Sequence, residues 1–278
     1  SIRISQSIKY FTKLFEFKAM KILITGSNGY IGKAIQKNLS GHELTLLHRG
    51  VCEITDEQQV DDFFLDAPYV DRYDIVIHCA AAGGSRLKGD TPKVLHDNLK
   101  MFLNLYKHKH KFDKFIHFGS GAQYHAPDTY YGFSKHIISE IMEIESNFFN
   151  LIIYGLFDKN ELETRFIKSC INNCKENKPI IVHKNKQMDF FHMEDLLKLV
   201  NEYIDGTRED RLVECVYAET FDLCQIARIV ISEMENGEII LKDTEVDKPY
   251  IRVGSPPNWI AGSNSLKEKI IQTVGELK

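Results

Sequence analysis

A tyrosine and a lysine in this sequence have the types and the spacing of an acid–base pair. Tyr131 and Lys135 stand one helical turn apart, so a helix places both side chains on one face. A tyrosine with an ordinary pKa of about 10 is a poor acid–base catalyst near neutrality, but a nearby ammonium group favours its phenolate. Ser120 ends the preceding apolar run, where its hydroxyl can hydrogen-bond a substrate carbonyl. We predict that Ser120, Tyr131 and Lys135 are catalytic.

A glycine-rich segment near residue 30 has the spacing Gly-x-x-Gly-x-x-Gly between an apolar strand and a helix. Gly26 allows a tight turn, Gly29 lets a pyrophosphate approach the backbone, and Gly32 lets helix and strand pack closely. The start of the helix supplies free N–H groups for the phosphates. The residues predicted to bind a dinucleotide here are Gly26, Ser27, Asn28, Gly29, Tyr30, Ile31 and Gly32.

The residues at the end of the second predicted strand indicate whether NAD or NADP binds. An acid at this place holds the ribose hydroxyls of NAD, whereas this chain has His48 and Arg49. A cationic Arg49 can meet the 2′-phosphate of NADP, so we predict NADP, with NAD as the alternative. Glu53 and Ile54 follow almost at once and are predicted to contact the adenine.

Alternating strands and helices must position these groups. The predicted strands span residues 21–25, 43–47, 74–79, 115–118 and 151–154, and the predicted helices span 34–39, 56–65, 95–107 and 134–145. Uniformly apolar strands that are each followed by a helix indicate a parallel sheet covered on both faces. The expected fold is α/β, a Rossmann-like doubly wound parallel sheet with a smaller C-terminal α/β substrate lobe.

The alternation weakens after residue 155. The predicted domains are an NAD(P)-binding Rossmann domain at 20–157 and a mainly substrate-binding lobe at 158–278, of which 184–205 returns to the Rossmann domain. Residues 1–19 contain a short amphipathic stretch and are predicted to be an extension outside the main fold. A membrane-surface or partner-binding helix is the alternative for this segment.

Composition narrows the function classes. The chain has 278 residues, 43% of them hydrophobic, and a net charge of -4, which argues against a general nucleic-acid binder. No apolar run approaches the roughly 20 residues of a membrane span. The six cysteines include no Cys-x-x-Cys pair, so we expect no metal site, and reduced thiols favour a cytoplasmic protein.

Together these motifs resemble the extended short-chain dehydrogenase/reductase (NAD-dependent epimerase/dehydratase) family, whose members act on nucleotide sugars. The resemblance covers about residues 20–195 and includes a His-x-Ala-Ala segment at 78–81 and an Asp-Phe segment at 189–190. It implies further cofactor residues at Cys79, Ala80, Ala81, Ala82, Asn98, Tyr154 and Leu156, besides Tyr131 and Lys135. It implies substrate residues at Gly84, Ser85, Gln123, Phe157 and Arg165.

The short link at residues 48–56 is similar to that of dTDP-4-dehydrorhamnose reductases and GDP-fucose synthases, two groups in this family. This likeness implies NADP(H)-dependent reduction of a 4-keto group on a nucleotide-diphosphate (6-deoxy)sugar. The family's dehydratases carry Asp-Glu where this chain has Gly121 and Ala122, and GDP-fucose synthases carry a cysteine at Ala122. The family's arginine for the substrate diphosphate is replaced by Met188, with Arg165 or Arg252 as substitutes.

Two other functions stay open at this point. An NAD-dependent nucleotide-sugar epimerase needs the same Ser120, Tyr131 and Lys135. A cofactor-binding regulator or scaffold without catalysis has no physical need to keep all three. Relatives often pair through two helices of the sheet domain, which predicts a homodimer formed by residues 95–107 and 134–145.

Overall fold

The structure is a computed structural model that describes residues 19–66, 72–84, 88–254 and 265–278. The predicted N-terminal extension at residues 1–19 therefore lies outside the described residues except for Ala19. Ser85, predicted to contact substrate, also lies outside them.

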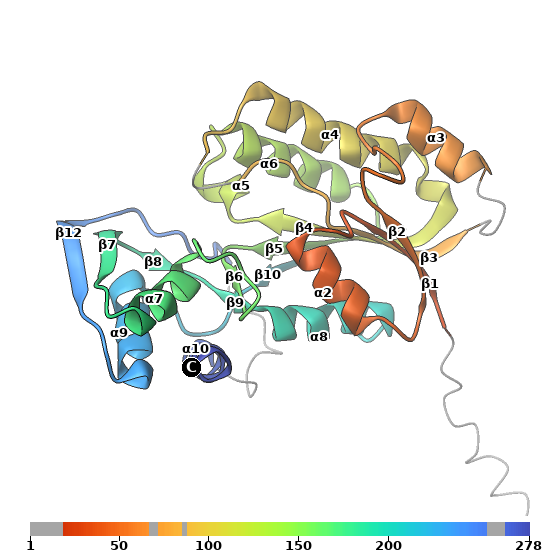
Figure 1. The fold of residues 1–278 in the computed structure, drawn as a ribbon. Coiled ribbons are helices and arrows are strands. Elements are labelled where there is room, and N and C mark those ends of the chain that lie inside the picture. The colour runs from red at the N-terminus through yellow and green to blue at the C-terminus, as the bar shows by residue number, and fades with distance from the viewer. Residues whose placement is uncertain (1–18, 67–71, 85–87, 255–264) are drawn as a thin grey trace, which may run out of the picture.

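A six-stranded parallel sheet forms the centre of the molecule (Figure 1). Its strands in spatial order are β2 (Glu43–Leu47), β1 (Lys21–Thr25), β3 (Tyr73–His78), β4 (Phe112–Ser120), β5 (Phe148–Ile153) and β10 (Leu212–Cys215). The chain crosses from one side of β1 to the other between β2 and β3. In such sheets a crevice opens at the carboxyl ends of the strands where the order reverses.

Helices cover both faces of the sheet, as the apolar strands predict (Figure 1). One face carries α2 (Tyr30–Asn38) and α8 (Met193–Ile204), and the other carries α3 (Glu57–Asp66), α4 (Pro92–Lys107) and α6 (Tyr130–Met142). Each face has its own buried apolar cluster. The predicted doubly wound α/β fold is thereby confirmed.

The remaining elements lie mostly after β5. They are η1 (Lys109–Lys111), α5 (Ala122–His125), β6 (Leu156–Phe157), α7 (Phe166–Lys175), β7 (Ile180–Asn185), β8 (Gln187–Met188), β9 (Phe191–His192), β11 (Phe221–Asp222), α9 (Leu223–Met234), β12 (Ile239–Val246) and α10 (Leu266–Leu277). The pair β7–β12 forms a separate parallel ribbon beside α7 and α9 (Figure 1). The predicted division of the chain at residue 158 stays a prediction.

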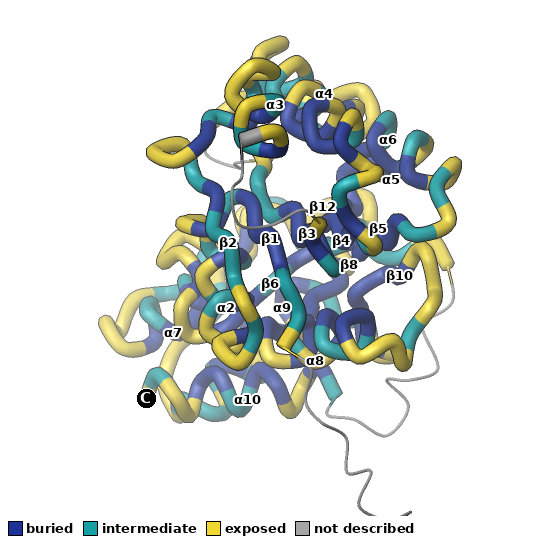
Figure 2. The backbone as a smooth tube through the Cα atoms, turned by 90° about the vertical axis from the view of Figure 1, so that its right-hand side faces the viewer, coloured by how far each residue is buried: buried dark blue, intermediate teal, exposed yellow. Residues whose placement is uncertain are grey.

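Figure 2 shows that the inner strands β1, β3, β4 and β5 are mostly buried, that the edge strand β2 is partly exposed, and that the outer helices expose one side to solvent. On α4 and α6, Leu103 and Phe133 are exposed large apolar side chains. The predicted homodimer through these helices stays a prediction. Within the described residues, no helix combines the length and the apolar composition needed to cross a membrane.

A buried ion pair attaches the last helix, α10, to α8. The side chain of Lys269 is only 1% exposed, and its Nζ donates to Glu194 at 2.7 Å and lies 3.8 Å from Asp195. The hydrogen bond from Lys269 lowers the pKa of Glu194 to about 2. Removing one member of such a pair leaves the buried Asp195 carboxylate with fewer partners.

We expect Lys269→Met to lower the free energy of unfolding by about 2–3 kcal/mol, because it removes a buried cation next to two carboxylates. Lys198→Met is the control, since Lys198 contacts the same two carboxylates but its side chain is 54% exposed. The control should cost less than about 1 kcal/mol. Urea unfolding measures both values, and equal losses would contradict the role given to Lys269.

Candidate functional site

Two cavities that share Cys79, Ala80 and Ala81 lie side by side at the carboxyl edge of the sheet. The first has a volume of about 390 Å³ and is lined by Ser120, Tyr131 and Lys135 among others. The second, of about 430 Å³, is lined by Gly26, Asn28, Gly29, Arg49, Glu53 and Ile54 among others. The structure thus brings the predicted catalytic residues and most of the predicted cofactor residues into two adjoining spaces.

The turn at Gly26 shapes the second cavity. Gly26 has a φ of +63°, and a Cβ there would lie 2.6 Å from the backbone nitrogen of Ala80. Only glycine meets both demands. The hydroxyl of Ser27 is buried and has no hydrogen-bond partner among the described residues, next to the N-terminal end of α2. Gly26 and Gly29 at the start of α2 leave room for the phosphates of a dinucleotide, whereas Ser27 itself lines neither cavity.

Arg49 stands at the outer end of the second cavity. Its side chain is 87% exposed, and its Nε lies 3.7 Å from Glu53. An exposed pair of this kind contributes little energy, so the guanidinium can turn to an anionic ligand. His48, which sequence analysis did not assign to the site, also lines this cavity and accepts a hydrogen bond from Gly50 at Nδ1.

The helix α6 positions Tyr131 and Lys135. It begins at Tyr130, earlier than predicted, because the Thr129 hydroxyl caps it by accepting a hydrogen bond from the N–H of Gly132 at 3.0 Å. Gly132 is required for packing, since a Cβ there would lie 2.0 Å from the carbonyl oxygen of Ala126. The predicted catalytic pair therefore lies on the first turns of a helix that packs against α5.

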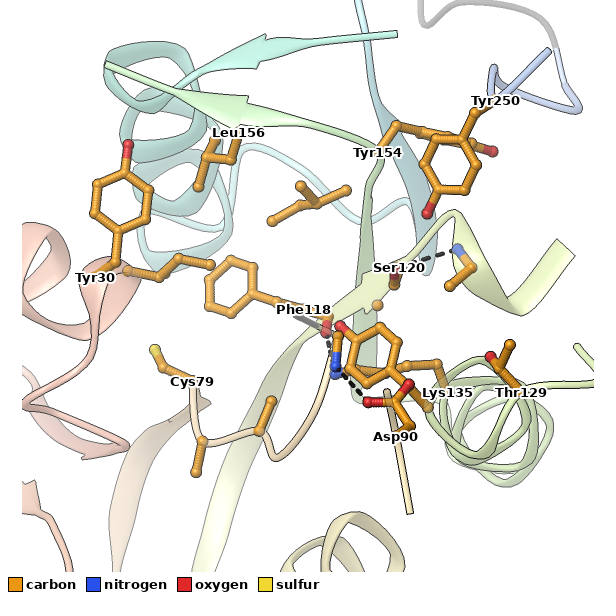
Figure 3. A pocket seen from close by; sticks show the side chains of 18 of the residues that line it. Tyr30, Cys79, Asp90, Phe118, Ser120, Thr129, Lys135, Tyr154, Leu156 and Tyr250 are labelled. Atoms are coloured by element: carbon orange, nitrogen blue, oxygen red, sulfur yellow. Dashed lines mark hydrogen bonds between the residues drawn. The ribbon is translucent and has the colours of Figure 1, made fainter. Parts of the chain in front are cut away.

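Lys135 lies in an apolar setting behind the end of β4. Its side chain is buried, and Nζ donates to the carbonyl oxygen of Phe118 at 2.7 Å (Figure 3). The same Nζ lies 3.3 Å from Nε2 of His117. Burial lowers the pKa of Lys135 to about 7. The amine is therefore able to gain or lose a proton near neutrality.

Tyr131 and Ser120 meet in the first cavity. Burial raises the pKa of Tyr131 to about 12, and a hydrogen bond with Ser120 opposes that rise. Nζ of Lys135 lies 5.8 Å from the centre of the Tyr131 ring. The hydroxyl of Ser120 in turn accepts a hydrogen bond from the N–H of Ala122 at 3.2 Å (Figure 3). The phenol is thus held in its protonated form beside a fixed hydroxyl group.

Asn98 supports the loop between the cavities instead of lining them. Its amide accepts from the N–H of Ala82 at 2.7 Å and donates to the carbonyl oxygen of Ala82 and to Ser134. These bonds attach the loop after β3 to α4 and α6. Ala82 and Gly32 likewise line neither cavity and act through the backbone.

The first cavity also contains residues that sequence analysis missed. Asp90, Thr129, Lys186 and Tyr250 line it together with the predicted Tyr30, Ile31, Gly84, Tyr154, Leu156 and Arg165. Asp90 was not apparent from the sequence because it acts locally, accepting a hydrogen bond from the N–H of Gly84 at 3.1 Å (Figure 3). A Cβ at Gly84, whose φ is +70°, would lie 2.9 Å from the ring of Tyr131.

A strap at residues 250–254 brings Tyr250 to the cavity. Glu214 on β10 accepts hydrogen bonds from the N–H groups of Val253 and Gly254 and from the hydroxyl of Tyr154. The guanidinium of Arg252 donates to the side chains of Asp189 and Thr220 and to two carbonyl oxygens. Arg252 is therefore committed to the strap and is not a substitute for the family arginine, whereas Arg165 lines the cavity.

Two predicted substrate residues lie away from the cavities. Gln123 is buried and donates to Ser139 on α6, the helix against which α5 packs. Phe157 is fully buried and packs against Phe190 and His192. Neither residue lines the two cavities, and their contact with substrate stays a prediction. In the described part of the chain, no group of three or more His, Cys, Asp or Glu side chains is arranged to hold a metal ion.

Solved structures share this fold at low sequence identity. MlghC, a GDP-mannoheptose C4 reductase from Campylobacter jejuni with NADP bound, aligns with a TM-score of 0.73 and 16% identity over 92% of this chain and 98% of that chain. A GDP-L-fucose synthetase from Naegleria fowleri aligns with a TM-score of 0.70 and 17% identity over 92% of each chain. A Thermus thermophilus UDP-glucose 4-epimerase in complex with NAD aligns with a TM-score of 0.71 and 14% identity over 92% of this chain and 98% of that chain.

No curated protein sequence matches the chain. A sequence model of the NAD dependent epimerase/dehydratase family matches residues 22–211, which include the central sheet apart from Lys21 and β10, the glycine turn and the Ser120, Tyr131 and Lys135 group. The resemblance inferred from the motifs is thereby confirmed, and the chain belongs to the NAD-dependent epimerase/dehydratase family.

Proposed function

We propose that the protein uses NADPH to reduce a 4-keto group on a nucleotide-diphosphate (6-deoxy)sugar. The observation that carries this proposal is the meeting of Ser120, Tyr131 and Lys135 in one cavity that adjoins the cavity of Arg49. The NADP-bound GDP-mannoheptose C4 reductase that shares the fold supports it.

In this reaction the bound cofactor supplies a hydride to the keto carbon, and the chain supplies the proton and the orientation. Tyr131 donates its phenolic proton to the forming alkoxide, and Ser120 holds the same oxygen through its hydroxyl. The raised pKa of Tyr131 keeps the phenol protonated until charge develops on the substrate. Lys135 stabilises the phenolate that remains.

Two cations serve the anionic end of the substrate. Arg165 and Lys186 line the catalytic cavity, and Arg165 is exposed to solvent. Among the described residues, Nζ of Lys186 lies 3.7 Å from Asp247 and 6.0 Å from the centre of the Tyr250 ring. Both can reach a diphosphate that Met188 cannot bind, since the Met188 side chain is buried in the core.

The surroundings of Ser120 favour plain reduction over elimination. Ala122 lines the cavity at the place where the family's dehydratases carry a carboxylate, and it offers neither an acid nor a thiol. An NAD-dependent epimerase would use the same three catalytic residues, and Arg49 favours the NADP-dependent reductase over it. The cytoplasmic location expected from the cysteines stays a prediction.

Mixing the protein with NADPH, or NADH, and a panel of nucleotide 4-keto-6-deoxysugars tests the proposal. We expect NADPH to be oxidised in the presence of one of these sugars. The absorbance of reduced nicotinamide measures this oxidation. Release of tightly bound NAD on denaturation, with sugar conversion and no net NADPH oxidation, would show an epimerase. If no sugar reacts with either cofactor, the function that remains is that of a cofactor-binding protein without catalysis.

Tyr131→Phe should fold and bind cofactor but lose about 10³-fold in kcat, because it removes the proton donor without changing the ring. The matched control is Tyr130→Phe, since Tyr130 precedes it on α6, is exposed and does not line the cavity. Stopped-flow absorbance gives kcat, and NADPH fluorescence gives binding. Near-normal turnover by Tyr131→Phe would refute its role.

Arg49→Ala should lower kcat/KM for NADPH roughly 10- to 100-fold, because it removes a charged hydrogen-bond donor to the 2′-phosphate. The value for NADH should stay within about twofold, as NADH has no such phosphate. Arg228→Ala, on the exposed face of α9, is the control. Parallel losses with both cofactors would show that Arg49 acts on something other than the 2′-phosphate.

A further inference from the structure

Asp90 brings a carboxylate to the catalytic cavity. Of the described residues that line this cavity, Asp90 alone is an aspartate or a glutamate, and it is half-buried. The reaction proposed above uses Ser120, Tyr131 and Lys135 and gives this carboxylate no task. A bound ligand that covers a carboxylate removes water from it, which costs free energy unless the ligand supplies a hydrogen-bond donor.

Two successive glycines bring the backbone against this carboxylate. Oδ1 of Asp90 accepts a hydrogen bond from the N–H of Gly84 at 3.1 Å (Figure 3). Gly83 and Gly84 have φ values of +76° and +70°, and a Cβ at Gly83 would lie 2.7 Å from the same oxygen. A larger residue at either place would be strained and would meet a neighbour, so the position of Asp90 depends on both glycines.

The carboxylate keeps capacity for a further donor. In the described part of the chain, Asp90 makes no hydrogen bond or ion pair besides the one from Gly84. An ionised carboxylate is an acceptor with two oxygens, so it can accept several hydrogen bonds. Thr129 lies on the same side of the cavity (Figure 3), but its hydroxyl already donates to the carbonyl oxygen of Ala126 and accepts from Gly132.

A single residue lies between this carboxylate and the phenol of Tyr131. Gly84 binds Asp90 through its N–H, and a Cβ at Gly84 would lie 2.9 Å from Cζ of Tyr131, the carbon that bears the hydroxyl. Burial is the main cause of the raised pKa of Tyr131, and the charge of Asp90 adds to it. Asp90 therefore lies next to the place where the proposed reaction holds the keto oxygen.

The chemistry of a carboxylate limits which part of the substrate it can meet. The diphosphate is attracted by Arg165 and Lys186, which line the same cavity, and is repelled by Asp90. The keto oxygen is itself an acceptor, so it forms no hydrogen bond with a carboxylate. The substrate groups that can donate to Asp90 are therefore the hydroxyls of the sugar.

The position of the keto group identifies one hydroxyl. The neighbours of a 4-keto carbon in the sugar ring are C3 and C5. In a 6-deoxyhexopyranose, C5 carries the ring oxygen and the methyl group and has no hydroxyl. The hydroxyl nearest to the keto oxygen, and hence to the phenol of Tyr131, is the one on C3.

We propose that Asp90 binds the C3 hydroxyl of the sugar and thereby selects substrates with a free hydroxyl on the carbon next to the keto group. The proposal rests on the proposed reductase function. Asp90 determines specificity in this scheme and transfers no proton to the substrate. A hydrogen bond to a charged group is typically equivalent to roughly 10- to 100-fold in affinity.

Removing the two partners of this hydrogen bond, singly and together, tests the proposal. The substrates are the nucleotide 4-keto-6-deoxysugar that the wild type reduces and the same compound without its C3 hydroxyl. We expect Asp90→Ala to lower kcat/KM roughly 10- to 100-fold for the hydroxylated sugar and less than about threefold for the 3-deoxy sugar. A change in Tyr131 or in the backbone at Gly84 would affect both sugars alike, and NADPH absorbance measures all four values.

Two further variants make the result specific. Asp90→Asn keeps an oxygen for the N–H of Gly84 but carries no charge, so its loss should lie between those of the wild type and Asp90→Ala. Asp128→Ala is the control, because Asp128 is exposed one residue before Thr129 and does not line the cavity. Thermal unfolding checks that all three variants fold. Equal losses of Asp90→Ala with both sugars, or no loss with either, would overturn the proposal.

A binding measurement separates this proposal from the proposed function. The 4-hydroxy forms of the panel sugars, such as GDP-L-fucose, cannot be reduced at C4, so calorimetry with NADPH present gives their affinities without turnover. The wild type should bind them roughly tenfold or more tightly than their 3-deoxy forms, and Asp90→Ala should lose this preference.

The two assays together distinguish the outcomes. If the wild type reduces no sugar but Asp90→Ala abolishes a preference for the C3 hydroxyl in calorimetry, the reductase function fails and the role of Asp90 stands. If NADPH is oxidised but the wild type prefers the C3 hydroxyl in neither assay, the role of Asp90 fails and the reductase stands. A wild type without this preference overturns the role of Asp90 whatever its activity.

Discussion

The hydrogen bond from Lys135 to the carbonyl oxygen of Phe118 is the interaction on which the site depends. At 2.7 Å it joins the first turns of α6 to the end of β4, and the ammonium that makes it is buried. A buried ammonium is tolerated only with close acceptors, and even so its pKa falls to about 7. The same bond fixes the height of Tyr131 above the strand that ends in Ser120.

Local charge, more than net charge, prepares the chain for an anionic ligand. The protein carries a net charge of -4, yet Arg49, Arg165 and Lys186 line the two cavities at the edge of the sheet. Arg252 is also a cation, but it forms an ion pair with Asp189. The sequence alone suggests that it could bind substrate, because it does not reveal this pairing. Cations at the rim of a partly enclosed cleft concentrate anions there, and a negative overall charge does not cancel this effect.

The parallel sheet could be predicted because its buried strands are short runs of apolar residues, which can be recognised in the sequence. The strands 21–25 and 43–47 were predicted with their observed bounds, since each is an apolar run that stops at a turn. The strand β10 was missed because it is short and contains Glu214, whose carboxylate serves the strap. The helix α6 begins earlier than predicted, as its cap at Thr129 is a polar residue outside the apolar pattern.

Some residues of the candidate site could also be predicted from the sequence, and others could not. The glycine turn and Tyr131 with Lys135 could be predicted, since motif spacing fixes them locally. Tyr250 could not, because hydrogen bonds from distant residues place it, and neither could the inward turn of Gln123.

The strap at residues 250–254 also determines how the molecule comes apart. The chain leaves the β7–β12 ribbon, passes Tyr250 and is attached to Glu214 on the edge strand of the main sheet. His125 on α5 donates to the carbonyl oxygen of Ile251 at 2.6 Å, so the strap is also attached to α5. Melting of the ribbon or of the sheet edge would break these hydrogen bonds, so the strap couples the local unfolding of the two. The cavity that contains Ser120 and Tyr131 is lined by Tyr250 from this strap, so its shape depends on the same hydrogen bonds.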